Sequence, residues 1–174
     1  DGVTEPLLIE AGDTCDRAYG VAVDIGTTTV AASLVDLGAG DTLGTKATHN
    51  RQTGYGEDVI SRLIHAERDG GLQSLQRAIV DTVNAVLGAL VAESGVAAED
   101  ITSLSCAGNT TMMHLFLGMD PYTIRRDPYV PTFAVAPAVN ARELGIAAYP
   151  QAPVACLPCV SSYVGGDITA GVIA

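Results

Sequence analysis

The chain has 174 residues, four cysteines and a formal net charge of −11 from 20 acidic against 9 basic residues, and this length suits one domain with a sizeable core. The acidic balance excludes nucleic acid as an expected partner, because nothing would neutralise its phosphates, whereas a nucleotide can still be held by backbone amides and a divalent metal. No run of 18 apolar residues and no secretory leader pattern occur, which predicts a cytoplasmic protein with no membrane partner.

Residues 1–18 contain glycine, proline and several carboxylates, and we expect them to form an extended linker. Three strand-like runs follow, separated by short turns that are rich in glycine and aspartate. These runs occupy residues 19–25, 28–36 and 43–49. Consecutive strands joined by short turns predict an antiparallel meander.

The first of these turns is the first candidate site. A free carboxylate inside a buried strand is costly, so Asp24 is expected at the end of its apolar run. Gly26 lets the backbone turn sharply and come close to a ligand. Thr27, Thr28 and Thr29 then place amide donors and hydroxyls in one tight bend, which suits an anion. The alternative is an ordinary hairpin turn with a solvated aspartate.

The other expected elements follow the period of the apolar residues. We expect two helices at 56–69 and 72–92, a strand at 101–108 and a third helix at 109–118. An irregular proline-rich stretch at 119–153 then leads to a strand at 154–163 and a last helix at 165–174. Asn109 or Thr110 is the expected N-cap of the third helix. Three antiparallel strands followed by alternating helices and strands predict an α/β fold of ribonuclease H-like type, with a mixed sheet flanked by helices.

A second candidate site, Gly165, Gly166 and Asp167, opens the last helix. The two glycines permit close approach of a ligand. In a ribonuclease H-like fold the preceding strand ends beside the first strand, so Asp24 and Asp167 are expected to face one gap. Two such carboxylates suit a magnesium-bound water and an attacking water. The alternative for Asp167 is a helix cap.

The cysteines and histidines favour structural roles. Cys156 and Cys159 form a CxxC pair, but a reactive pair normally lies at a helix N-terminus, and these residues are predicted in a strand. No second ligand pair accompanies them, so zinc is not expected. His49, His65 and His114 lie on different elements and are expected to be solvated or structural.

Several motifs also carry a family resemblance. DIGTTT at 24–29 is similar to the first phosphate motif of the superfamily that includes acetate and sugar kinases, heat-shock chaperones and actin. Four segments together resemble the reductive activators of corrinoid-dependent methyltransferases: NRQTGYGEDVISR (50–62), AGNTTMMHLFLG (107–118), PYVP (128–131) and YVGGDITAGVIA (163–174). The resemblance covers the chain from Tyr19 onward. One departure is Arg51, where the family pattern leads us to expect proline in an NPQ triplet ending at Gln52.

The resemblance implies that residues 19–174 are the first lobe of an actin-like ATPase domain in a longer protein. Such activators carry a ferredoxin-type two-iron two-sulfur (2Fe-2S) iron-sulfur domain before the ATPase region. They use ATP to help return cob(II)alamin to cob(I)alamin on a corrinoid protein or a corrinoid-dependent methyltransferase. The second phosphate loop, the adenosine motif and the cluster cysteines are not in this chain, so the lobe alone is expected to bind ATP weakly or not at all. We also consider a homodimer, formed through the apolar face that a second lobe would cover.

By the same resemblance, Asp24 binds the magnesium nucleotide through water, and the residues from Gly26 to Thr29 hold phosphate. Asp167 matches the carboxylate of the first connecting motif, and Asn109 helps to line the cleft. Two other functions stay open: a sugar or acyl kinase of the same superfamily, and a non-catalytic assembly module. The presence of both carboxylates argues against the assembly module.

Overall fold

A computed structural model of the chain describes residue 14, residues 17–162 and residues 164–173. The linker expected at 1–18 lies almost wholly outside the described residues.

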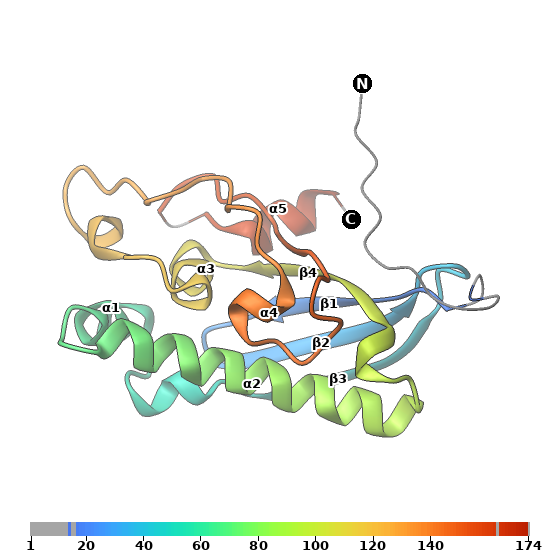
Figure 1. The fold of residues 1–174 in the computed structure, drawn as a ribbon. Helices are drawn as coiled ribbons and strands as arrows, with labels where there is room; N and C mark the ends of the chain where they lie inside the picture. The colour runs from blue at the N-terminus through green and yellow to red at the C-terminus, as the bar shows by residue number, and fades with distance from the viewer. Residues whose placement is uncertain (1–13, 15–16, 163, 174) are drawn as a thin grey trace.

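The protein is built on a five-stranded mixed sheet with the strand order β3-β2-β1-β4-β5 (Figure 1). β1 (Tyr19–Ile25) pairs antiparallel with β2 (Thr29–Asp36), and β2 pairs antiparallel with β3 (Thr42–His49). On its other side β1 pairs parallel with β4 (Ile101–Gly108), which pairs parallel with the short β5 (Val154–Cys156). This topology confirms the expected meander and the α/β class, and its strand order agrees with a ribonuclease H-like lobe.

One face of the sheet carries the hydrophobic core. Val21, Val23 and Ile25 are buried on this face of β1, because alternate side chains of a strand point to the same side. The long helix α2 (Gly71–Ser94) lies across this face (Figure 1). Its buried apolar residues recur at helical spacing and include Leu75, Ile79, Val83, Val86, Leu87 and Leu90. Truncation of one such leucine to alanine would cost about 2–5 kcal/mol, so α2 is a main source of the stability of the sheet.

α2 is also, within the described part of the chain, the helix that is long and apolar enough to cross a membrane. Its apolar stripe packs on the sheet, as the stripe of a core helix does. Packing in the core therefore accounts for the hydropathy of α2 without a membrane.

The three expected helices are present, and caps or glycines set their ends, with α1 shorter than the expected 56–69. α1 (Val59–Ala66) begins after Asp58, whose side chain accepts a hydrogen bond from the Ser61 amide at 2.7 Å. The break before α2 contains Gly70, which has a φ of 68°. α3 (Thr110–Leu117) has Asn109 as its N-cap, and the Asn109 side chain accepts from the Met112 amide at 3.0 Å.

The strand predicted at 154–163 is wrong beyond Cys156. β5 has three residues, and the Leu157 amide still donates to the Cys106 carbonyl at 2.9 Å. Pro158 follows and has no amide hydrogen with which to continue the ladder. The chain then leaves the sheet and reaches the last helix, α5 (Gly166–Ile173), which is present as expected.

The stretch at 119–153 is largely irregular, as expected, but it is not confined to the surface. It contains a short 3₁₀ helix (Tyr122–Arg125) and α4 (Ala141–Leu144). Ile146 and Ala152 in this stretch are buried against the core. The apolar residues of this proline-rich stretch have no regular spacing in the sequence, yet some of them are buried.

The described cysteines are free thiols, and their placement supports a structural role. Cys106 and Cys156 lie side by side on β4 and β5, and Cys159 is buried just beyond. Burial, followed by the neighbouring Cys159, raises the pKa of Cys156 to about 12. A thiol that stays protonated at neutral pH is a poor nucleophile.

His114 on α3 is buried and ties the irregular stretch to the core. Its Nδ1 lies 2.7 Å from the Thr110 carbonyl, and the Thr132 amide donates to its Nε2 at 3.1 Å, which assigns the proton to Nδ1. The ring stacks on Phe133 with centroids 4.1 Å apart. Burial lowers the pKa of His114, against the opposing effects of the Thr110 hydrogen bond and the charge of Asp120. His114 is therefore structural, as expected.

Candidate functional site

The candidate residues gather where β1 and β4 end. The two strands run parallel with Ile25 opposite Gly108, so the loop after β1 and the start of α3 lie at one edge of the sheet. Asp24 is the penultimate residue of β1 and its side chain is exposed. Asn109 directly follows β4, and its Nδ2 donates to the Thr27 Oγ1 at 3.2 Å. One hydrogen bond thus joins two of the expected phosphate-site segments.

The backbone carbonyls of the loop after β1 accept hydrogen bonds from two buried residues, Asn50 and Arg62. The side-chain amide of Asn50 donates to the Gly26 carbonyl at 2.9 Å, and the Asn50 backbone amide donates to the Thr28 carbonyl at 2.8 Å. Arg62 Nη2 donates to the Thr27 carbonyl at 2.6 Å. Three consecutive carbonyls of the loop are therefore engaged with the protein.

The amides of this loop are differently placed. The Gly26 amide donates to the Thr29 carbonyl at 3.0 Å and closes the turn. Among the described residues, no hydrogen bond from the amide of Thr27 or Thr28 is found. Backbone donors without a partner beside a strand end are the elements of an anion site. The turn can be both a hairpin connection and an anion site. It joins β1 to β2, and the amides of Thr27 and Thr28 still remain available as donors to a ligand.

The structure brings Asp24 and Asp167 near one another. Although Asp24 is partly exposed to solvent, its pKa is raised, first by the partial desolvation of its carboxylate and second by the negative charge of Asp167. Asp167 is exposed in the first turn of α5, and its Oδ1 accepts from the Ile168 amide at 2.8 Å. Asp24 also lines a cavity of about 330 Å3 with Leu157 and Ala170, the latter one turn after Asp167.

This donor set fits magnesium held through water. Mg²⁺ keeps several waters and is held in nucleotide sites by one or two carboxylates, which Asp24 and Asp167 can supply. A cation between the two carboxylates would also relieve their mutual repulsion. No cluster of three or more His, Cys, Asp or Glu able to hold a metal occurs in the described part of the chain, so a metal site made of protein ligands alone is not indicated.

The two glycines before Asp167 pack against protein backbone. A Cβ at Gly165 would lie 2.4 Å from the Asn109 Cα and 2.5 Å from the Gly108 carbonyl oxygen. A Cβ at Gly166 would lie 2.8 Å from the Leu157 carbonyl oxygen. These glycines let the segment before α5 lie directly on the end of β4, and this close packing carries Asp167 to the site. Contact of either glycine with a ligand stays a prediction.

Three buried polar residues near the loop were not predicted as part of the site. Asn50, Gln52 and Arg62 are all fully buried. Gln52 accepts from Arg62 Nη1 at 3.2 Å and donates to the Leu75 carbonyl at 3.0 Å, which gives this residue a structural place. No pattern in the sequence marks Arg62, which is buried beside Leu63 on α1, because arginine is usually exposed.

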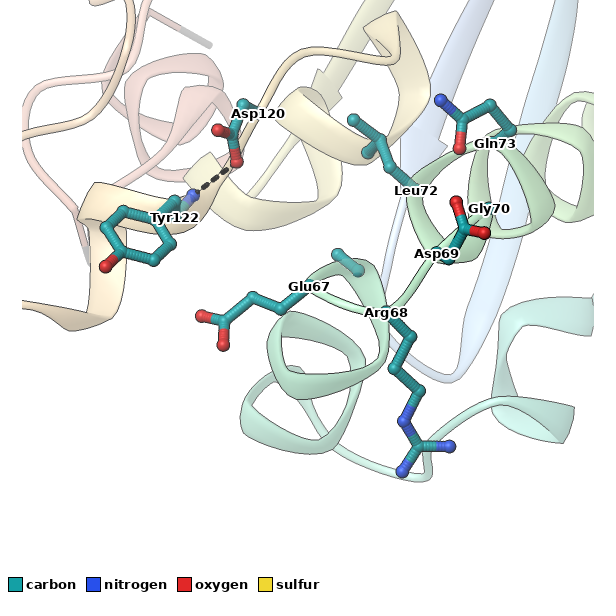
Figure 2. Close-up of a pocket in the computed structure, with 9 residues that line it drawn as sticks. Glu67, Arg68, Asp69, Gly70, Leu72, Gln73, Asp120 and Tyr122 are labelled. Atoms are coloured by element: carbon teal, nitrogen blue, oxygen red, sulfur yellow. Dashed lines mark hydrogen bonds between the residues drawn. The ribbon is translucent and has the colours of Figure 1, made fainter.

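A larger pocket, of about 730 Å3, lies away from this edge, where the turn between α1 and α2 faces the segment after α3 (Figure 2). Its labelled side chains do not converge: Glu67 and Arg68 point away from Leu72 and Gln73 in the view. Glu67 is already paired with Arg125, with 2.6 Å between the Nη2 and Oε1 atoms. The pocket is therefore large, but its side chains do not converge on a position where one ligand would bind.

Three comparisons with known proteins bear on this site. The family model described as "RACo middle region" matches residues 19–174. The corrinoid activation enzyme RamQ of Eubacterium limosum is 31% identical over 153 residues, which are 87% of this chain and 26% of that protein. A solved structure named "reductive activator for corrinoid, iron-sulfur protein" is 46% identical, with a TM-score of 0.93, over 96% of this chain and 27% of that one. The chain thus spans about a quarter of the length of these relatives.

Proposed function

Because the chain belongs to the RACo middle region family, we propose that it is the nucleotide-binding first lobe of an ATP-dependent reductive activator of a corrinoid protein. In this proposal residues 19–174 form one lobe of an actin-like ATPase domain, preceded by a linker. The complete protein is cytoplasmic, and its partner is a corrinoid protein or a corrinoid-dependent methyltransferase. The electrons come from an iron-sulfur domain outside this chain.

The observation that carries the proposal is the composition of one edge of the sheet. Two loop amides without a hydrogen-bond partner among the described residues, the Asn109 side chain and the carboxylates of Asp24 and Asp167 all lie there. A chain with a net charge of −11 can hold a polyphosphate where donors are concentrated and a divalent cation accompanies the ligand. The names of the relatives, which describe corrinoid activation, agree with this proposal.

Each residue then has a distinct task. The amides of Thr27 and Thr28 donate to phosphate oxygens, and the Asn109 amide fixes the Thr27 hydroxyl beside them. Asp24 accepts hydrogen bonds from waters of the bound cation, and Asp167 orients the attacking water. Magnesium-bound ATP supplies the transferable phosphoryl group and the cation that neutralises its charge. Positioning and charge neutralisation are the main sources of rate in phosphoryl transfer.

The proposal is tested by calorimetric titration of the full-length protein with Mg-ATP, followed by an ATP hydrolysis assay with and without a corrinoid protein. We expect binding, and hydrolysis that rises when the corrinoid protein is added. Phosphate transfer to a sugar or an acyl acid, without a corrinoid effect, would replace the proposal with a kinase. Absence of nucleotide binding by the full-length protein would replace it with an assembly module.

A homodimer is the remaining part of the proposal, and the face of the sheet opposite α2, which α5 covers only in part, motivates it. Small residues of β1, β2 and β4 line this face, among them Ala22, Ser33 and Ser105. Light scattering of the lobe alone tests for association through this face. A monomer at high concentration would remove the homodimer from the proposal.

A further inference from the structure

Arg62 on α1 is a buried cation that forms no ion pair with the residues that the structure describes. Its side chain is fully buried, and its guanidinium donates to the carbonyls of Gly56 and Thr27 at 2.9 and 2.6 Å. The Nη1 atom lies 3.2 Å from both the Gln52 Oε1 and the Met112 sulfur. Within the part of the chain that the structure describes, none of the ion pairs involves Arg62.

Such a buried cation is costly. The desolvation of an ion in a protein interior costs several kcal/mol, and a partner charge normally offsets it. Burial lowers the pKa of Arg62, and the charge of Asp58 opposes this shift without forming an ion pair. Arg125 shows the usual solution, because it pairs with Glu67 at the surface. The neutral acceptors around Arg62 satisfy its hydrogen bonds but leave its charge without a counter-ion.

The hydrogen bonds of Arg62 indicate where an anion would feel its charge. The carbonyl that accepts from Nη2 belongs to the peptide unit between Thr27 and Thr28. The amide of the same peptide unit, that of Thr28, is one of the two donors for which no partner is found in the described part of the chain. A hydrogen bond to a carbonyl polarises its peptide unit and strengthens the amide at the other end as a donor. Arg62 therefore lies behind the loop, on the side opposite to the free donors.

We propose that Arg62 is a positioning residue for phosphate: its buried charge attracts the anion and acts through the Thr27–Thr28 peptide without touching the ligand. Asn50 acts in the same way on the preceding peptide, because its Nδ2 donates to the Gly26 carbonyl. Gln52 orients the guanidinium and contributes no charge. The inference rests on the proposed function, since the anion in question is the phosphate of the nucleotide.

Two variants of the full-length protein test the inference from opposite sides. Arg62→Met removes the charge and keeps most of the length of the side chain. Gln52→Glu keeps Arg62 and the acceptor that faces it, and supplies the guanidinium with a counter-ion inside the protein. We expect both to weaken the binding of Mg-ATP and of inorganic pyrophosphate by about 10- to 100-fold in calorimetric titration, as for the loss of a charge-assisted interaction. The binding of adenosine, which has no phosphate, is expected to stay within about two-fold.

The Gln52→Glu variant separates an electrostatic role from a merely structural one. Gln52→Glu gives the buried cation a partner but removes the hydrogen bond that Gln52 donates to the Leu75 carbonyl, so its melting temperature is measured beside its affinity. Weaker phosphate binding at a melting temperature equal to or above that of the wild type cannot come from a loosened fold. Arg77→Met and Gln73→Glu, two exposed positions on α2, are the matched controls with the same changes of charge. Both controls are expected to bind Mg-ATP as the wild type does. If Arg62→Met fails to fold, Gln52→Glu alone decides.

Unchanged pyrophosphate affinity in folded Gln52→Glu would overturn the inference and leave the proposed function in place. An equal loss of adenosine and Mg-ATP binding would also overturn it, because the residues would then act on the fold. Failure of the wild-type protein to bind either Mg-ATP or pyrophosphate would overturn the proposed function and the inference together.

Discussion

The packing of Gly165 allows a sharp prediction for the replacement Gly165→Ala. The added Cβ would lie 2.4 Å from the Asn109 Cα and 2.5 Å from the Gly108 carbonyl oxygen, and both are backbone atoms that no rotamer change can move. Overpacking of this kind costs about 1–3 kcal/mol. The segment before α5 must move away from β4 and take Asp167 with it. We therefore expect local destabilisation of α5 and slower hydrolysis of Mg-ATP.

Gly171→Ala, inside α5, is the control, because a Cβ at Gly171 meets nothing within 4 Å. This replacement should stabilise α5 by about 0.5–1 kcal/mol through helix propensity. Hydrogen exchange of the α5 amides in the full-length protein measures both changes. The amides of α5 should exchange about 5- to 150-fold faster in Gly165→Ala than in the wild type. Equal protection in Gly165→Ala and the wild type would refute the packing of this segment on β4.

Three further predictions concern the carboxylates, the buried histidine and the thiols. In the full-length protein, Asp24→Asn and Asp167→Asn should each slow ATP hydrolysis roughly 30- to 1,000-fold, and the double variant should lose much less than the product; a wild-type rate for Asp167→Asn would leave Asp167 only a helix cap. Because burial lowers the folded-state pKa of His114, its contribution to stability is complete above pH 6.5 and falls by up to about 1.4 kcal/mol per unit as the pH drops toward that folded-state pKa; denaturation curves that are the same for His114→Asn and the wild type from pH 7 to 5 would contradict this. The Cys156→Ser, Cys159→Ala double variant should reduce the corrinoid near the wild-type rate, since the pKa of Cys156 is raised to about 12, and loss of reduction with the fold intact would restore a redox role for the pair.

Much of the fold could be predicted because its causes are local. The alternation of Val21, Val23 and Ile25 indicates a strand, and the spacing of the leucines in α2 indicates a helix. Asn109 as an N-cap follows from side-chain chemistry alone. The end of β5 was missed, since the apolar run continues past Cys156 and the effect of Pro158 was not weighed against it.

The site could be predicted only in part. The topology alone brings the end of β1 toward α5, and the effect of Asp167 on the pKa of Asp24 agrees with that expectation. The burial of Arg62 could not be read from its type, because arginine is usually exposed. Its surroundings come from three separate segments, which contribute Thr27, Gly56 and Met112. A contact set spread over so much of the chain has no period or spacing that a sequence shows.

The central claim is that this lobe couples ATP to the reduction of a corrinoid on another protein. The most direct measurement is the visible absorption spectrum of a cob(II)alamin-loaded corrinoid protein, mixed with the reduced full-length protein, with and without Mg-ATP. The account predicts that Mg-ATP brings about conversion of cob(II)alamin to cob(I)alamin with the wild-type protein, and that Asp24→Asn slows it on the order of 30-fold or more. Conversion at the same rate and to the same extent without ATP, or an Asp24→Asn variant as fast as the wild type, would contradict the account.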